Sequence, residues 1–173
     1  MAYTYKFLET SNGNAAMAWN QRQAIYRLDA KVDVADVITD GTGTLASATQ
    51  ITAAESVAVL DIPKNCLALG VMTRIITAST DTTATVDVGI DVESPDTNAG
   101  DVEGFDAAVD ITATAGTNYW SDNANDAYCL QLASGKVFTQ ADTLDILFNN
   151  NTTNGVMLFM MLIVDMADSA IDP

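Results

Sequence analysis

The chain has 173 residues, a net charge of −16 and no histidine. A chain of this length is expected to form one domain that buries about 70% of its unfolded surface without a disulfide or a metal staple. The negative charge argues against duplex nucleic acid and anionic membranes as partners, because both would repel the protein. Without imidazole, Ser–His or Cys–His catalysis and histidine-ligated metals are excluded, and no cofactor is expected.

The two cysteines, Cys66 and Cys129, lie in apolar contexts typical of strands and form no CxxC pair. We expect both to be buried free thiols in a protein made in a reducing cytoplasm, with a disulfide between neighbouring strands as the alternative. The N-terminus lacks the continuous apolar stretch of a signal peptide.

Residues 1–23 are expected to form an N-terminal arm, in which "AYTYKFLE" alternates aromatic with other residues and "AAMAWNQRQ" favours a short helical segment. Residues 1–31 hold four of the seven basic residues, whereas the rest of the chain carries a net charge of −18. Opposite charge steers association and aromatic residues anchor interfaces, so this basic region is a candidate contact for an acidic partner. The candidate contact residues are Lys6, Trp19, Arg22, Arg27 and Lys31; scattered surface cations are the alternative.

Residues 24–173 are expected to form the β-domain. The segment 24–34 alternates apolar and charged residues with a period of two, which indicates a strand with one buried face. The small and polar segment 40–54 is typical of a loop. Strands are expected at 56–62, ended by Pro63, and at 66–78.

The stretch "TVDVGIDVES" (85–94) alternates without a fault. It places Val86, Val88 and Ile90 on a dry face and Asp87 and Asp91 on a wet face. Further strands are expected at 128–133, 136–139, 143–148 and 156–164. The last two flank Asn154-Gly155, a pair that favours the positive φ angles of a hairpin turn.

About eight short strands and almost no helix predict an all-β fold, either an antiparallel sandwich or a jelly roll. The closing strand 156–164 is apolar on both faces, yet nine residues are too few for a membrane-spanning helix. One face can enter the core, and the other needs cover from a loop or from a second subunit. The candidate residues for packing against other copies are Val156, Leu158, Met160, Leu162 and Val164.

The remaining polar cluster is acidic. Calcium prefers oxygen ligands, and Asp96, Asp101 and Glu103 in the loop 94–104 are the candidates for such a site, although the spacing fails the EF-hand pattern. A solvated surface that keeps the protein soluble is the favoured alternative. No pair of acids is singled out for glycoside hydrolysis, so an enzyme is not expected.

Three segments carry a family resemblance by their order: "LDIPKNCLALGVMTRIITASTDTTATVDVGID", "VEGFDAAVDITATAGT" and "SGKVFTQADTLDILF". Over about residues 56–165 the chain resembles the small jelly-roll decoration, or cement, proteins of tailed-bacteriophage heads. The arm is longer and more aromatic than a minimal member of that family has.

The resemblance implies a homotrimer on the outer surface of the virion, seated at local three-fold positions of the shell. There it would hold neighbouring major capsid subunits together, after synthesis in the host cytoplasm. A receptor- or glycan-binding head of a phage fibre is the competing function, and it would need an exposed aromatic platform. Tyr119 and Trp120 are the candidates for that platform.

Overall fold

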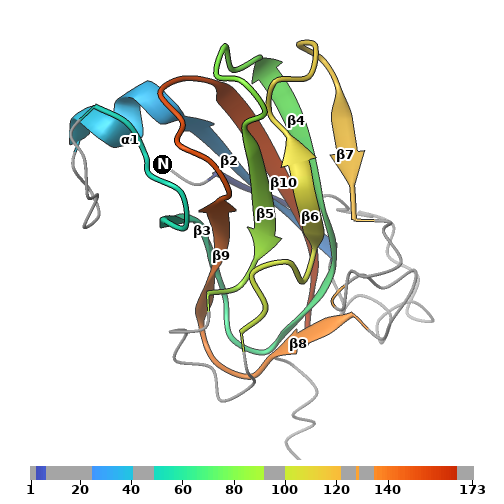
Figure 1. Cartoon of the computed structure of the whole chain (residues 1–173). Coiled ribbons are helices and arrows are strands. Elements are labelled where there is room, and N and C mark those ends of the chain that lie inside the picture. The colour runs from blue at the N-terminus through green and yellow to red at the C-terminus, as the bar shows by residue number, and fades with distance from the viewer. Residues whose placement is uncertain are drawn as a thin grey trace, which may run out of the picture.

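The computed structural model describes residues 3–6, 25–40, 49–91, 100–121, 128 and 135–166, with the side chains of 3–6 and 40 excepted. These residues form ten strands and one short helix, arranged as two antiparallel sheets packed face to face (Figure 1). No described helix has the length and apolar character that crossing a membrane requires.

Sheet A contains the two ends of the folded chain. Its strand order is β1-β2-β10-β4-β7, and β8 pairs with the other end of the long strand β4. The strands span Tyr3–Lys6 (β1), Ile25–Asp33 (β2), Val156–Asp165 (β10), Cys66–Thr77 (β4), Asn118–Trp120 (β7) and Lys136–Phe138 (β8).

The second of the two sheets, which we call sheet C, has four strands in the order β3-β9-β5-β6. They span Ser56–Ile62 (β3), Asp142–Phe148 (β9), Thr85–Gly89 (β5) and Asp106–Asp110 (β6). The helix α1, Val34–Asp40, follows β2 directly, and Val37 and Ile38 pack against the core between the sheets. The sequence pattern did not predict α1, β6 or β7, all of which are short.

The strand order identifies the sandwich as a jelly roll. Leaving out β1 and β8, the chain visits the sheets in the order A, C, A, C, C, A, C, A, with β10 between β2 and β4 and β9 between β3 and β5. This is the eight-stranded double Greek key of that architecture. The predicted fold class is therefore confirmed.

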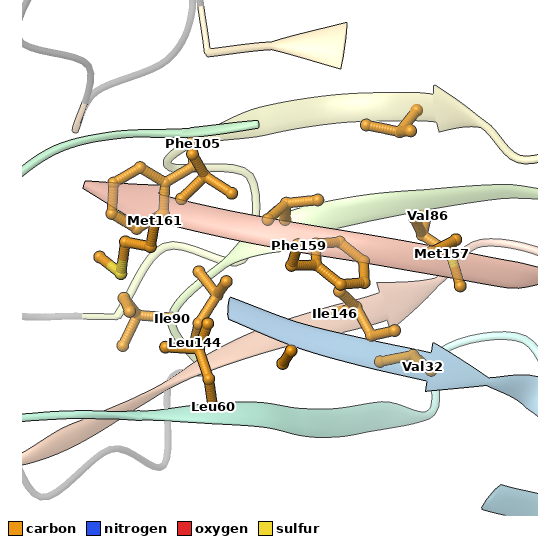
Figure 2. Close-up of a cluster of buried hydrophobic side chains, with 14 of the residues drawn as sticks. Val32, Leu60, Val86, Ile90, Phe105, Leu144, Ile146, Met157, Phe159 and Met161 are labelled. Atoms are coloured by element: carbon orange, nitrogen blue, oxygen red, sulfur yellow. The ribbon is translucent and has the colours of Figure 1, made fainter. Parts of the chain in front are cut away.

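The core lies between the two sheets, and β10 supplies its centre. Met157, Phe159, Met161 and Ile163 alternate toward the inside and are each at most 2% exposed. Figure 2 shows Phe159 and Met161 among side chains of the facing sheet, including Ile146 from β9. Cys66, at the start of β4, is a buried free thiol. Its burial, and to a smaller extent the negative charge of the nearby Asp165 carboxylate, raise its pKa to about 12.

The predicted hairpin between the last two strands is wrong. β9 belongs to sheet C and β10 to sheet A, so residues 149–155 carry the chain across the sandwich. Gly155 adopts a φ of 128°. Asn154 instead uses its side chain, which accepts a hydrogen bond from the Thr80 amide at 2.9 Å. A local turn signal cannot distinguish a hairpin from such a corner.

Part of the predicted arm extends sheet A. β1 pairs antiparallel with β2, with Tyr5 opposite Arg27 and Lys6 opposite Tyr26. The helical segment expected within 15–23 lies outside the described residues, as do Cys129 and the rest of the strand expected at 128–133 apart from Tyr128.

Candidate docking face on sheet A

The outer face of sheet A, which points away from the core, is organised in rows that run across the strands. Residues directly opposite in neighbouring strands share a face. Three rows run from β2 through β10 to β4: Lys31–Leu158–Arg74, Asp29–Met160–Met72 and Arg27–Leu162–Gly70. The first two continue into β7 as Asn118 and Trp120, and a fourth row, Ile25–Val164–Leu67, continues into β8 as Val137. We call this set the A face.

The middle of the A face is apolar. Met72 is only 7% exposed, yet it is not part of the core cluster, because it lies on the opposite side of β4 from Val71 and Ile75. Beside it, Trp120 is 57% exposed, and at the other end of β4 Val137 is 43% exposed. A contiguous apolar surface of this kind is typical of an interaction site.

The β10 residues of the A face are half-buried. Val156, Leu158, Met160, Leu162 and Val164 all have intermediate exposure, in alternation with the buried inner row. The described elements are the two sheets and α1, which packs against the core. None of them forms a further layer over the A face. Within the described residues, this side of β10 is therefore covered only by neighbouring side chains of the same sheet, and not by a loop.

The A face also gathers the surface cations. Side chains are described for five basic residues: Arg27, Lys31, Lys64, Arg74 and Lys136. Three of these, Arg27, Lys31 and Arg74, lie on the A face. Lys64 lies in the exposed β3–β4 turn, and Lys136 is buried with its ammonium 4.4 Å from the centre of the Tyr128 ring.

Two of the predicted contact residues are therefore placed beside the predicted self-association row. Lys31 is exposed, whereas Arg27 forms an ion pair with Asp29 at 2.8 Å. The second carboxylate oxygen of Asp29 is buried without a hydrogen-bond partner. Lys6 lies in β1, its side chain outside the description, and Trp19 and Arg22 lie outside the described residues altogether.

Sheet C differs sharply in charge. Its four strands contain six aspartates and no lysine or arginine: Asp61, Asp87, Asp106, Asp110, Asp142 and Asp145. The expected wet row of acids on β5 is only partly correct. Asp87 is 5% exposed and accepts hydrogen bonds from the Ala108 amide at 2.7 Å and from Asn149 Nδ2 at 2.8 Å, so it ties β5 to its surroundings instead of facing solvent.

Asp145, on β9 of sheet C, has a pKa that its surroundings shift upward. Burial, reinforced by the nearby carboxylates of Asp91 and Asp142, raises its pKa from 3.8 to about 6. Hydrogen bonds from the Asp91 amide and the Thr143 hydroxyl oppose that rise but do not cancel it. The folded protein therefore holds a proton on Asp145 that the unfolded chain releases at lower pH.

Replacing Asp145 with asparagine should stabilise the protein, by an amount that grows with pH. Between pH 3.8 and pH 6 the ionised unfolded state is increasingly favoured, so the wild type loses stability as pH rises. At about 1.4 kcal/mol per pKa unit, the gain for Asp145→Asn should be about 1.5 kcal/mol at pH 5 and about 3 kcal/mol above pH 7. Urea unfolding of the variant and the wild type at pH 5 and at pH 8 measures this gain in the free energy of unfolding.

Asp61→Asn is the matched control, because Asp61 is exposed on the same sheet. It should change the free energy of unfolding by less than about 0.5 kcal/mol at both pH values. A loss of stability for Asp145→Asn that is equal at pH 5 and pH 8 would show that the ionised carboxylate is the stabilising form.

The structure describes two of the three calcium candidates, Asp101 and Glu103. Asp96 lies outside the described residues. A carboxylate oxygen of Asp101 accepts a hydrogen bond from the Glu103 amide at 3.1 Å, and Glu103 is exposed. Within the described part of the chain, no three carboxylate or thiol groups converge as a metal site would require.

One pocket of about 520 Å³ opens at the edge of the sandwich between β2 and β3. It is lined mainly by apolar residues, with Asp61, Lys64 and Asp165 at its polar part. Asp145, the acid with the raised pKa, does not line it. The structure thus does not bring Asp145 and this pocket together.

The proposed aromatic platform is split between the two sides of β7. Tyr119 packs against the core and donates a hydrogen bond to the Asp110 carbonyl at 3.2 Å, whereas Trp120 is exposed on the A face. Sequence reasoning missed Met72, Arg74, Leu67 and Val137 as members of this surface. The alternation within 66–78 contained the signal for the β4 residues, but only the β4–β10 register joins them to Leu158 and Met160.

No protein-family model matches the chain, and no curated protein matches its sequence. Solved structures do match its fold. A chain of the cyanophage Pam1 capsid asymmetric unit aligns with a TM-score of 0.51 and 14% identity, covering 91% of this chain and 91% of that chain. A chain of the Ralstonia phage GP4 capsid aligns with a TM-score of 0.50 and 12% identity, covering 93% and 90%. The fold of this protein is one that occurs in phage capsid structures.

Proposed function

We propose that this protein is a structural component of a phage virion: a trimeric decoration protein that binds the outside of the head. In that position it reinforces the contacts between major capsid subunits. The proposal needs no catalytic group, no cofactor and no nucleic acid or membrane partner. It is supported by the shared fold with chains of two phage capsids, which extends over nearly the whole chain.

The observation that carries the proposal is the A face. It is an apolar surface that no other described element covers, and it holds three of the five cations whose side chains are described in a chain of net charge −16. Such a surface fits a protein that works by binding other protein surfaces. A small-molecule enzyme would instead concentrate its unusual features in a cleft.

The mechanism of reinforcement is linkage. A protein that binds the assembled shell but not its separate subunits shifts the equilibrium toward the shell. Three copies acting together add avidity, so each footprint can be modest while the trimer stays bound. The basic segment around Lys6, Trp19 and Arg22 is the candidate for the head contact, because its charge is opposite to that of the body.

Sedimentation with phage heads that lack the protein tests this function. The purified chain should pellet with the heads, raise the temperature at which they break open, and leave host cells unlabelled. Arg22→Glu should weaken head binding at least tenfold at low salt, and Lys64→Glu, which makes the same charge change elsewhere, should not. Absence of the wild-type protein from the head pellet would rule the function out.

A receptor- or glycan-binding head is the second candidate, and the exposure of Trp120 is the observation in its favour. An exposed indole can stack on a sugar ring. If this function is correct, the protein should label host cells or immobilised surface glycans, and Trp120→Ala should abolish that binding. The decoration function predicts no cell binding to abolish.

A further inference from the structure

We infer that the A face is the interface between copies of this chain, with Met160, Met72 and Trp120 at its centre. The inference rests on the trimer of the proposed function and assigns it a surface. It also moves Arg27 and Lys31 from the head contact to the rim of the contact between copies.

The apolar content of the A face favours a permanent partner. Interfaces between subunits of stable oligomers are more apolar than transient contacts. Here the apolar residues extend without a break across β8, β4, β10 and β7: Val137, Leu67, Val164, Leu162, Met160, Met72, Leu158 and Trp120. Methionine side chains adapt their shape to a partner, and an exposed tryptophan is a frequent anchor of binding energy.

Charge explains why the occupant is a second copy. Two molecules of net charge −16 repel each other, so they can meet only where that repulsion is locally relieved. The strands of sheet C carry aspartates without a cation. On the A face, β2 instead alternates Arg27, Asp29, Lys31 and Asp33, and Arg74 lies on the far side of the apolar centre.

The mixed charges of the A face suit a cyclic arrangement of copies. In a cyclic trimer the contact is heterologous, so the β2 side of one copy meets the β4 side of the next. Arg74 is exposed and forms no ion pair with any described residue. It lies two strand spacings, about 10 Å, from Lys31 across Leu158. A neighbouring copy can supply its carboxylate partner.

Tryptophan fluorescence tests the interface directly, since the chain has only Trp19 and Trp120. In the full-length Trp19→Phe variant, emission comes from Trp120 alone. In an oligomer that uses the A face, this emission should shift to the blue and resist acrylamide quenching at least threefold more than in the dissociated chain. Light scattering with size exclusion gives the oligomeric state of the same samples.

Met160→Glu should break the oligomer, raising its dissociation constant at least a hundredfold, because it buries an unpaired carboxylate at the centre of the contact. Gln140→Glu is the matched control: it adds the same charge at an exposed turn, and the oligomer should persist. The surface pair Lys31→Glu with Arg74→Glu keeps the test independent of folding defects, and it should weaken association at least tenfold.

Three results would overturn the inference. They are an oligomer in which Trp120 remains as open to acrylamide as in the free chain, an oligomer that survives both Met160→Glu and the Lys31–Arg74 pair, and a monomer at every concentration. In the first two cases head binding can persist, and the decoration function then stands with a different contact between copies. Failure of the wild-type protein to bind heads is a separate result, and it would rule out the decoration function itself.

Discussion

Phe159→Ala should reduce the free energy of unfolding by about 3 to 5 kcal/mol, the range for deleting a buried aromatic ring. Phe159 is fully buried at the middle of β10, and Figure 2 shows its ring between the two sheets. Both neighbours of β10 are held by its ladder, so the backbone cannot collapse easily into the cavity. Equilibrium unfolding in urea measures the loss.

Ile76→Ala on β4 is the control, because it removes an apolar side chain that is 41% exposed. We expect a loss of about 1 kcal/mol, in proportion to the smaller area taken from water. Equal losses in the free energy of unfolding for the two variants would mean that the buried Phe159 side chain contributes no more to stability than the exposed Ile76 side chain, contrary to the observed burial.

Gly89→Ala should be the second severe substitution, with a loss of about 3 kcal/mol, at the upper end for overpacking. A Cβ at Gly89 would lie 2.0 Å from the carbonyl oxygen of Asp101 and 2.5 Å from the carbonyl carbon of Val102. Both contacts are backbone, so neither can rotate away. The same carbonyl oxygen of Asp101 accepts the Ile90 amide at 2.9 Å, and that hydrogen bond should be lost as well.

Gly116→Ala separates steric overlap from backbone strain. Gly116 has a φ of 94°, which alanine adopts at a penalty, but a Cβ added there would meet no described atom of a non-adjacent residue within 4 Å. We expect a loss of about 1 kcal/mol. A Gly89→Ala protein as stable as the wild type, by thermal melting, would show that residues 100–102 can move away without loss.

Much of the fold could be predicted from period-two patterns. The alternation in 24–34 and the doubly apolar strand 156–164 correspond closely to β2 and β10, and Pro63 does follow the end of β3. These signals are strong because one face of each strand must be buried, which fixes the type of residue at every second position. The jelly-roll alternative followed from the number and spacing of strands.

The failures have a common physical cause, which is that the pattern of one strand does not reveal what covers it. Asp87 alternates as a solvent-facing residue should, yet the Ala108 amide and Asn149 satisfy it in a nearly buried position. The close approach of Asp101 to Gly89 is equally invisible in the sequence. Contacts between distant segments decide both cases.

The candidate site was predicted in parts that the structure joins. The sequence assigns Arg27 and Lys31 to the head contact by their charge, and the apolar row Leu158, Met160 and Leu162 to the contact between copies. The β2–β10 register places them side by side. Trp120 could be separated from Tyr119 only once β7 was known to be a strand of sheet A.

The pairing of β2 with β10 also governs how the protein is made. Asp33 pairs with Val156, which lies 123 positions further along the chain, so the central ladder of sheet A cannot form before β10 has been synthesised. Non-local pairing of this kind slows folding, because the loop must close before any contact rewards it. Until β10 is available, β2 and β4 lack the apolar strand that lies between them, and a nascent chain in that state is vulnerable to aggregation.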